Sequence, residues 1–89
     1  MSARNLVLND GTTIEDGDAG LSSSNNLWLW FTGYTMMQVA LMFLDTEKTS
    51  RITFHQSEDV VDVYEGYTNC ININMETNGQ FHVCLTREG

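Results

Sequence analysis

Two cysteines and a histidine near the end of the chain are the residues that most readily suggest chemistry. Cys70, His82 and Cys84 are all of a type that binds zinc, and side-chain alternation can bring them to one face of a β-hairpin. A zinc ion holds its ligands within a few ångströms, so the register of that hairpin decides whether the site can form.

The hairpin is predicted from Asn78-Gly79, a dipeptide typical of tight turns, with strands over residues 68–76 and 80–87. A two-residue turn would mix apolar and polar residues on each face. A three-residue loop over residues 77–79 places Gly79 in a left-handed bulge and keeps the faces separate. The apolar pairs are then Met75 with Phe81, Ile73 with Val83 and Ile71 with Leu85.

This register predicts neither a zinc site nor a disulfide. His82 falls about 13 Å along the strands from Cys70, which is too far for one tetrahedral ion. Cys84 falls opposite Asn72, and Cys70 falls opposite Thr86. The two thiols then share a face at a diagonal distance of about 7–8 Å, beyond the reach of a disulfide. We therefore expect free thiols.

The other catalytic and metal-binding patterns in the chain are incomplete. Asp16, Asp18 and Gly20 resemble the start of a calcium loop, but Leu21 and Leu27 stand where its glycine and its closing glutamate belong. No phosphate-binding or dinucleotide-binding glycine pattern is present, and neither histidine has a nucleophile at a recognisable spacing. We expect a protein that is not an enzyme and that uses no metal and no cofactor.

The charge balance is the strongest compositional signal. The 89-residue chain has 12 acidic and 4 basic residues, which gives a formal net charge of −8. Direct binding to nucleic acid or to an anionic membrane needs clustered lysine and arginine, so we expect neither. An acidic surface favours a protein partner with a basic surface, although acidity can also serve only to keep a small domain soluble.

Acidic residues in two parts of the chain are the candidates for contact with a basic partner. The sequence leaves open whether the two groups lie on one side of the molecule. The first group is Asp10, Glu15, Asp16 and Asp18, and the second is Glu58, Asp59 and Asp62.

Trp28 and Trp30 are further candidates for partner binding. In a strand over residues 27–31 the two tryptophans point to one side, while the leucines and Phe31 point to the other. A strand that is apolar on both faces is either covered twice within its own domain or presents one face to a partner. Both alternatives stay open.

Local patterns predict the elements around these residues. The turn at residues 9–11 predicts a hairpin that places Leu6 opposite Ile14. Residues 15–26 are polar and rich in glycine and serine, so we expect a loop. Further strands are expected over residues 51–55 and 60–64, with a turn at residues 57–59.

One helix is predicted after the tryptophan strand. Thr35 and Gln38 have the spacing of a capping box, and residues 45–50 are polar and end the helix. The side chains of this helix are apolar on nearly every side, so we expect the rest of the domain to cover it well. Its buried stripe is Met36, Val39, Ala40 and Phe43, widened by Met37, Leu41 and Leu44.

Together these elements predict a single domain over residues 1–89 of the α+β class. We expect a strongly twisted antiparallel sheet, or a partly open small barrel, of about six strands with one helix packed across it.

Several stretches of the chain resemble a known type of protein. They are LWLWFTGYT at residues 27–35, the helix, KTSRITF at residues 48–54 and YEGYT at residues 64–68. These stretches resemble small uncharacterised proteins of tailed phages and prophages of Gram-positive gut bacteria, and the first and last hairpins fit the same pattern. The resemblance spans most of the chain and implies a phage origin and no enzymatic activity.

Two functions compete within that frame. The first is an acidic, stoichiometric inhibitor of a host defence nuclease, comparable with anti-CRISPR proteins, which would block a basic nucleic-acid-binding surface in the host cytoplasm. The second is a small virion subunit of the head–tail or tail-accessory kind, in which self-association would bury an apolar face or pair an edge strand. A third reading is a solubility-tuned fold with an unknown cellular partner. The first nine residues lack the pattern of a secretory signal, which agrees with an intracellular site and reduced thiols.

Overall fold

The structure, a computed structural model, describes residues 4–87 and is mostly β. Its strands form two four-stranded antiparallel sheets in the orders β2-β1-β5-β6 and β3-β4-β8-β7. The expected single sheet of about six strands with one helix is therefore replaced by two sheets and two short helices, and no closed barrel forms. The elements are β1 Asn5–Val7, β2 Thr13–Ile14, β3 Asp18–Leu21, β4 Asn26–Phe31, α1 Met36–Phe43, α2 Thr46–Thr49, β5 Arg51–His55, β6 Val61–Glu65, β7 Asn69–Met75 and β8 Phe81–Thr86.

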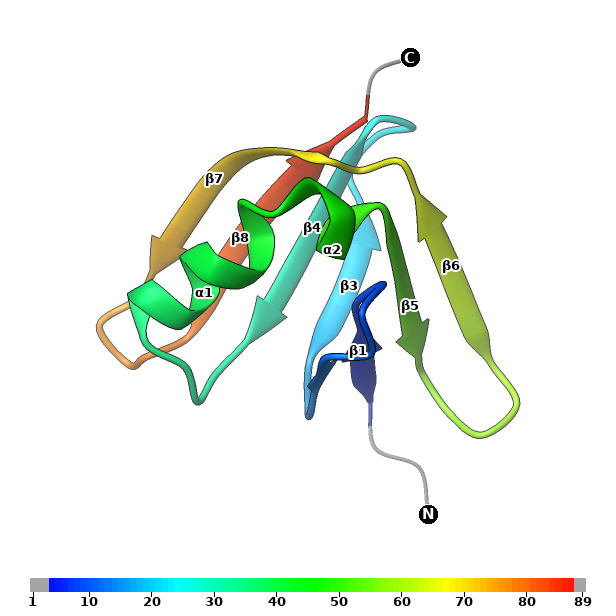
Figure 1. The fold of residues 1–89 in the computed structure, drawn as a ribbon. Coiled ribbons are helices and arrows are strands. Elements are labelled where there is room, and N and C mark those ends of the chain that lie inside the picture. The colour runs from blue at the N-terminus through cyan, green and yellow to red at the C-terminus, as the bar shows by residue number, and fades with distance from the viewer. Residues whose placement is uncertain (1–3, 88–89) are drawn as a thin grey trace.

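The two sheets approach each other where β1 lies next to β3 (Figure 1). A backbone hydrogen bond joins them there, because the Gly17 amide donates to the Arg4 carbonyl at 2.8 Å. Alternate residues of both sheets point inward and form one hydrophobic cluster. Its fully buried large side chains are Phe31, Phe43, Phe54, Phe81, Leu6, Ile14, Leu27, Leu29, Ile52, Leu85, Val39 and Val83.

Helix α1 begins at the predicted capping box. The Gln38 amide donates to the Thr35 hydroxyl at 3.2 Å, and the Thr35 amide donates to the Gln38 side-chain oxygen at 2.8 Å. The helix contacts β7 (Figure 1). Its Phe43 ring stacks on Phe31 of β4 with 5.6 Å between ring centroids. Phe31 stacks in turn on Phe81 at 5.7 Å, so three aromatic rings join α1, β4 and β8.

The prediction that α1 is well covered is wrong. Its buried residues are Val39, Met42 and Phe43, and Ala40 is half-buried. The opposite side of the helix is exposed, because no second layer covers it in the described part of the chain. The exposed side chains are Met36, Met37, Leu41 and Leu44.

A second short helix, α2, follows where the sequence predicted only a polar end to α1. Asp45 caps it, since its carboxylate accepts from the Glu47 amide at 3.0 Å and the Lys48 amide at 3.4 Å. This helix connects α1 to β5 and contacts both.

Both predicted hairpin loops are confirmed. In the first, Leu6 pairs with Ile14 and the Leu8 amide donates to the Thr12 carbonyl at 2.8 Å. In the last, the Gly79 amide donates to the Glu76 carbonyl at 2.9 Å, and Gly79 is left-handed with φ of 90°. Met75 pairs with Phe81 and Ile73 with Val83, as the apolar pattern required.

The far end of the last hairpin differs from the prediction, because a β-bulge shifts the register between Cys70 and Asn72. Cys70 therefore lies opposite Leu85 instead of Thr86, and Ile71 has lost its expected partner. Cys70 now packs against the inner cluster, whereas Cys84 lies on the other face of the sheet, opposite Trp28. Both cysteines are free thiols, but the bulge separates them by face, so the shared face expected from the sequence is wrong.

These two thiols are expected to react slowly with alkylating reagents. Burial raises the pKa of both Cys70 and Cys84 above 9.0, so at neutral pH almost no reactive thiolate is present. Iodoacetamide labelling of the native protein at pH 7.5, followed by mass spectrometry, should be much slower than labelling of glutathione. The same protein in denaturant is the control and should label at the ordinary rate; fast native labelling of either cysteine would contradict the buried placement.

The segment expected to be a loop over residues 15–26 contains an additional strand, β3. It pairs antiparallel with β4, and its register places Asp18 opposite Trp30 and Gly20 opposite Trp28. The segment is polar because β3 is an edge strand whose residues are at best half-buried. Pairing with the apolar β4 thus overrides the low strand propensity of its glycine and aspartate residues.

Candidate partner-binding face

The outer face of the β3-β4-β8-β7 sheet collects the aromatic and polar residues that the register brings side by side. Trp30 lies between Asp18 on β3 and His82 on β8, and Trp28 lies beside Gly20. We call these five residues the tryptophan face. The side chains of β4 therefore alternate between a fully buried apolar side and a half-buried tryptophan side. The tryptophan side of that strand is therefore not fully covered by the described residues.

The ring of Trp30 is held by its neighbours on both sides. The Trp30 and His82 ring centroids are 6.3 Å apart in an edge-to-face arrangement with 73° between the planes. On the other side, the ring reaches over Gly20, where an added Cβ would lie 3.8 Å from Cζ3 of Trp30. A glycine at this position keeps the ring face free of a neighbouring side chain.

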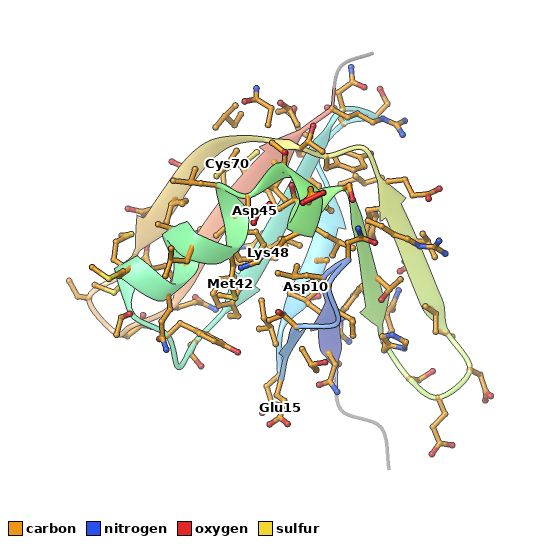
Figure 2. The ribbon with its side chains drawn as sticks, viewed as in Figure 1. Asp10, Glu15, Met42, Asp45, Lys48 and Cys70 are labelled. Carbon is orange, nitrogen blue, oxygen red and sulfur yellow. The ribbon has the colours of Figure 1, made fainter. Side chains whose placement is uncertain are left out.

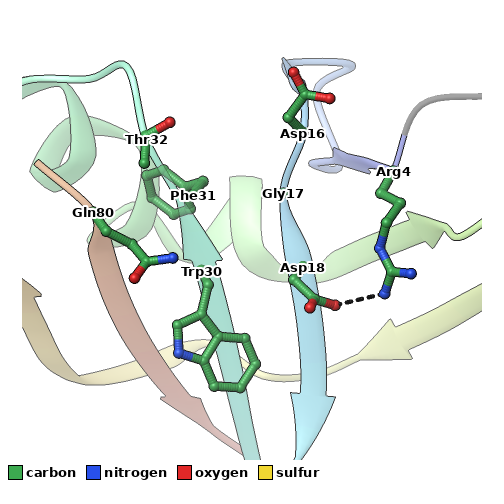
Figure 3. A pocket seen from close by; sticks show the side chains of 8 residues that line it. All are labelled: Arg4, Asp16, Gly17, Asp18, Trp30, Phe31, Thr32 and Gln80. Carbon is green, nitrogen blue, oxygen red and sulfur yellow. Dashed lines mark hydrogen bonds and ion pairs between the residues drawn. The ribbon is translucent and has the colours of Figure 1, made fainter.

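Two open hollows flank Trp30. The first hollow has a volume of about 370 Å³; Asp18 lies beside the indole, and Asp16 lies at the far end of the hollow (Figure 3). The second hollow, of about 380 Å³, is mostly apolar and lies between the two indoles and the β3–β4 turn. The first is lined by Arg4, Asp16, Gly17, Asp18, Trp30, Phe31, Thr32 and Gln80, and the second by Gly20, Leu21, Ser22, Trp28, Trp30 and His82.

Asp18 and Arg4 form an ion pair at the edge of the first hollow, with 2.9 Å between Nη2 and Oδ1 (Figure 3). Both side chains are 53% exposed, so the pair contributes at most about 1 kcal/mol to stability. The Arg4 guanidinium also lies 5.2 Å from the centre of the Phe54 ring, a cation–π contact. The chain's own Arg4 guanidinium therefore already lies on the Asp18 carboxylate at this edge of the hollow.

Asp16 is placed by an unusual backbone conformation. Its φ is 58°, in the left-handed region that aspartate, asparagine and glycine tolerate best. The next residue, Gly17, is buried against Leu6, and its amide donates to the carbonyl of Arg4, directly before β1, which fixes the start of β3. The turn therefore directs Asp16 to the rim of the first hollow, and Glu15 lines an adjoining polar hollow beside it.

The structure brings together five of the nine residues expected from the sequence. Glu15, Asp16, Asp18, Trp28 and Trp30 line connected hollows on one side. Asp10 lies apart, beside Lys48 of α2 (Figure 2). A hydrogen bond from the Thr12 amide to its carboxylate lowers the pKa of Asp10 below 3.8.

The second acidic group lies on the β5–β6 hairpin. Glu58 and Asp59 are in its turn, whereas Asp62 points to the side of β6 that carries Tyr64 and accepts a hydrogen bond from Gln56. Burial raises the pKa of Tyr64 above 10.0. The negative charge of Asp62 and, more weakly, that of Asp18 raise this pKa further. Asp62 and Asp18 thus both act on Tyr64, whereas Glu58 and Asp59 are not part of the tryptophan face.

Sequence reasoning missed His82, Gly20 and Arg4 as parts of this face. His82 was aligned with Asn74 across the hairpin, and that pairing is confirmed. Its position beside Trp30 depends on the pairing of β4 with β8, which are separated by 49 residues and carry no local signal of their pairing. The same is true of Gly20, because its glycine- and serine-rich segment predicts a loop and not the strand β3.

Within residues 4–87 no group of three or more histidine, cysteine, aspartate or glutamate residues is arranged to hold a metal ion. None of the helices in the same range is long and apolar enough to cross a membrane. Comparison of the chain with protein-family models, with curated proteins and with solved structures found no match.

Proposed function

We propose that this chain is a non-enzymatic binding module that takes a protein partner with a basic surface on its tryptophan face. The observation that carries the proposal is the first hollow, where Asp18 lies beside the half-buried indole of Trp30 and Asp16 lines the far end of the same hollow (Figure 3). Tryptophan is the best aromatic receptor for a cation, and a carboxylate beside it adds a charge-assisted hydrogen bond. This chemistry fits arginine and lysine side chains.

The overall charge supports the same partner class. With a net charge of −8, the chain attracts basic surfaces over a distance of about one Debye length, roughly 8–10 Å at moderate salt. Defence nucleases hold nucleic acid in basic channels. The proposed role is therefore stoichiometric inhibition of a phage-targeting nuclease in the host cytoplasm, by occupation of the surface that would otherwise bind nucleic acid.

The test is a cleavage assay with a guide-loaded, RNA-guided DNA nuclease titrated with the purified chain. Inhibition should saturate near equimolar protein and weaken with rising salt. Because both tryptophans of the chain lie on the tryptophan face, their fluorescence reports binding directly. An arginine-rich peptide is the simplified probe and should change this emission.

The variant D16N/D18N should weaken binding at least about tenfold and flatten its salt dependence. Asparagine keeps the left-handed backbone of Asp16, so loss of charge is separated from loss of fold. Glu47→Gln is the matched control, because Glu47 is an exposed acid of α2 that lines none of the hollows on this face. Equal affinity of D16N/D18N and wild type, or an equal loss in Glu47→Gln, would contradict the proposed contact.

A small virion subunit is the second candidate function. The observation that favours it is the exposed apolar side of α1, which is the kind of surface that assembly buries. Rings or larger regular particles in solution, seen by light scattering and electron microscopy without any partner, would favour this candidate over the inhibitor.

A further inference from the structure

Among residues 4–87, Arg4 is the only arginine or lysine that lines the two hollows beside Trp30. Its guanidinium lies on the Asp18 carboxylate at the edge of the first hollow, with 2.9 Å between Nη2 and Oδ1 (Figure 3). Asp18 is also the acidic residue that the sheet register places directly beside Trp30. A cationic side chain of a partner that uses Asp18 and Trp30 together therefore meets a cation that the chain itself supplies.

The backbone of Arg4 is fixed beside the start of β3, because its carbonyl accepts a hydrogen bond from the Gly17 amide at 2.8 Å. The side chain has a second contact besides Asp18, since the guanidinium lies 5.2 Å from the centre of the Phe54 ring. This contact does not involve the hollow. The Arg4 side chain can therefore leave the carboxylate and still keep a favourable contact at the rim.

Asp18 does not depend on Arg4 for its orientation. The Ala19 amide donates to the same carboxylate oxygen, Oδ1, at 2.9 Å. The backbone of Asp18 is fixed by the pairing of β3 with β4, which places it opposite Trp30. Removal of the Arg4 charge would therefore release the carboxylate for another cation while the carboxylate stays beside the indole.

The ion pair is weak enough to be exchanged. Both side chains are 53% exposed, and a pair of this kind favours the closed arrangement by at most about fivefold. When a site must first be vacated, its apparent affinity falls by the fraction of molecules in which it is free. A second cation in the hollow is also repelled by the Arg4 charge for as long as Arg4 stays there. Both effects lower the affinity for a basic partner.

We propose that Arg4 is a built-in competitor for the cation-binding position on the tryptophan face. In the free chain Arg4 occupies Asp18, and a cationic side chain of the partner displaces it. The position is thus closed by a residue of the chain itself until a partner supplies a stronger set of contacts. This inference rests on the proposed function, because it concerns the same carboxylate and the same indole.

The test is Arg4→Gln, titrated with the arginine-rich peptide and followed by tryptophan fluorescence. Binding should be about two- to fivefold tighter than in the wild type. The matched control is Arg51→Gln, which removes the same charge from another exposed ion pair, that of Arg51 with Glu65 at 4.0 Å, outside both hollows. Its gain should be clearly smaller. Both arginines are more than half exposed, so circular dichroism should show an intact fold.

Asp18→Asn shows whether the gain depends on the carboxylate. In this background Arg4 has no carboxylate to occupy, so the addition of Arg4→Gln should give little further gain. An equal gain with and without Asp18, an equal gain in Arg51→Gln, or weaker binding by Arg4→Gln would overturn the inference. If D16N/D18N weakens binding and Arg4→Gln leaves it unchanged, only this inference fails. If no variant and no wild-type protein binds the peptide, the proposed function fails as well.

Discussion

Phe31→Ala is expected to lower the free energy of unfolding by about 3–5 kcal/mol, the typical cost of removing a buried aromatic ring. Phe31 is 1% exposed and stacks on Phe43 and Phe81, with an edge contact to Tyr34 at 5.6 Å. Among residues 4–87 no other ring joins α1, β4 and β8 in this way. The loss is a large part of the about 5–15 kcal/mol that stabilises a domain of ordinary size.

Urea unfolding followed by circular dichroism measures this effect. Trp30→Ala is the informative control, because it removes a larger ring from the adjacent position of the same strand. Trp30 is only half-buried, so its removal should cost clearly less stability while it weakens partner binding. Equal losses of stability in the two variants would mean that the tryptophan side of β4 belongs to the core as much as the phenylalanine side does. That result would contradict the description of β4 as a strand with one buried side and one half-buried side.

Gly17→Ala is expected to destabilise the protein by about 1–3 kcal/mol, the usual cost of overpacking. A Cβ at this position would lie 2.7 Å from Cδ1 of Leu6, and Leu6 is fully buried between β2 and β5. The backbone amide and its bond to Arg4 would remain, so the effect is one of packing alone. A displaced β3 would also move Asp18 away from Trp30.

Gly20→Ala in the same strand provides the control, since its new Cβ would meet Trp30 at an ordinary contact distance of 3.8 Å. Its thermal midpoint should stay close to that of the wild type, whereas that of Gly17→Ala should fall by roughly 4–8 °C per kcal/mol. Adding Leu6→Val to Gly17→Ala removes the clashing methyl group and should recover part of the loss. If the loss of stability in the double variant is the sum of the losses in the two single variants, the proposed clash between the new Cβ and Leu6 is contradicted.

Local sequence signals predicted the parts of the fold that depend on neighbouring residues. The capping box at Thr35, the left-handed Gly79 and the hairpin pairing of Leu6 with Ile14 all involve residues within eight positions of one another. Alternation along β4 likewise separated the tryptophans from Phe31 correctly. Each of these features follows from backbone geometry or from the period of a strand, so the sequence is sufficient.

The errors arose where distant segments decide the structure. The polar segment of residues 15–26 becomes strand β3 only because β4 offers it a backbone to pair with. The bulge at Cys70 depends on how β7 curves along β8, and no residue type in NCININM marks it. The helix α1 has the composition of a buried helix, but the two sheets supply enough surface to cover only one of its sides.

For the candidate site, the composition and the strand pattern were enough to identify the available groups: a net charge of −8, acidic residues before β4 and two outward tryptophans. Which of these groups meet depends on the tertiary structure. It places Asp16, Asp18 and Trp30 around one hollow, adds His82 from a strand far along the chain, and leaves Asp10 beside α2. Cross-strand neighbours are set by sheet order and register, which the burial of the whole core selects and which no local pattern records.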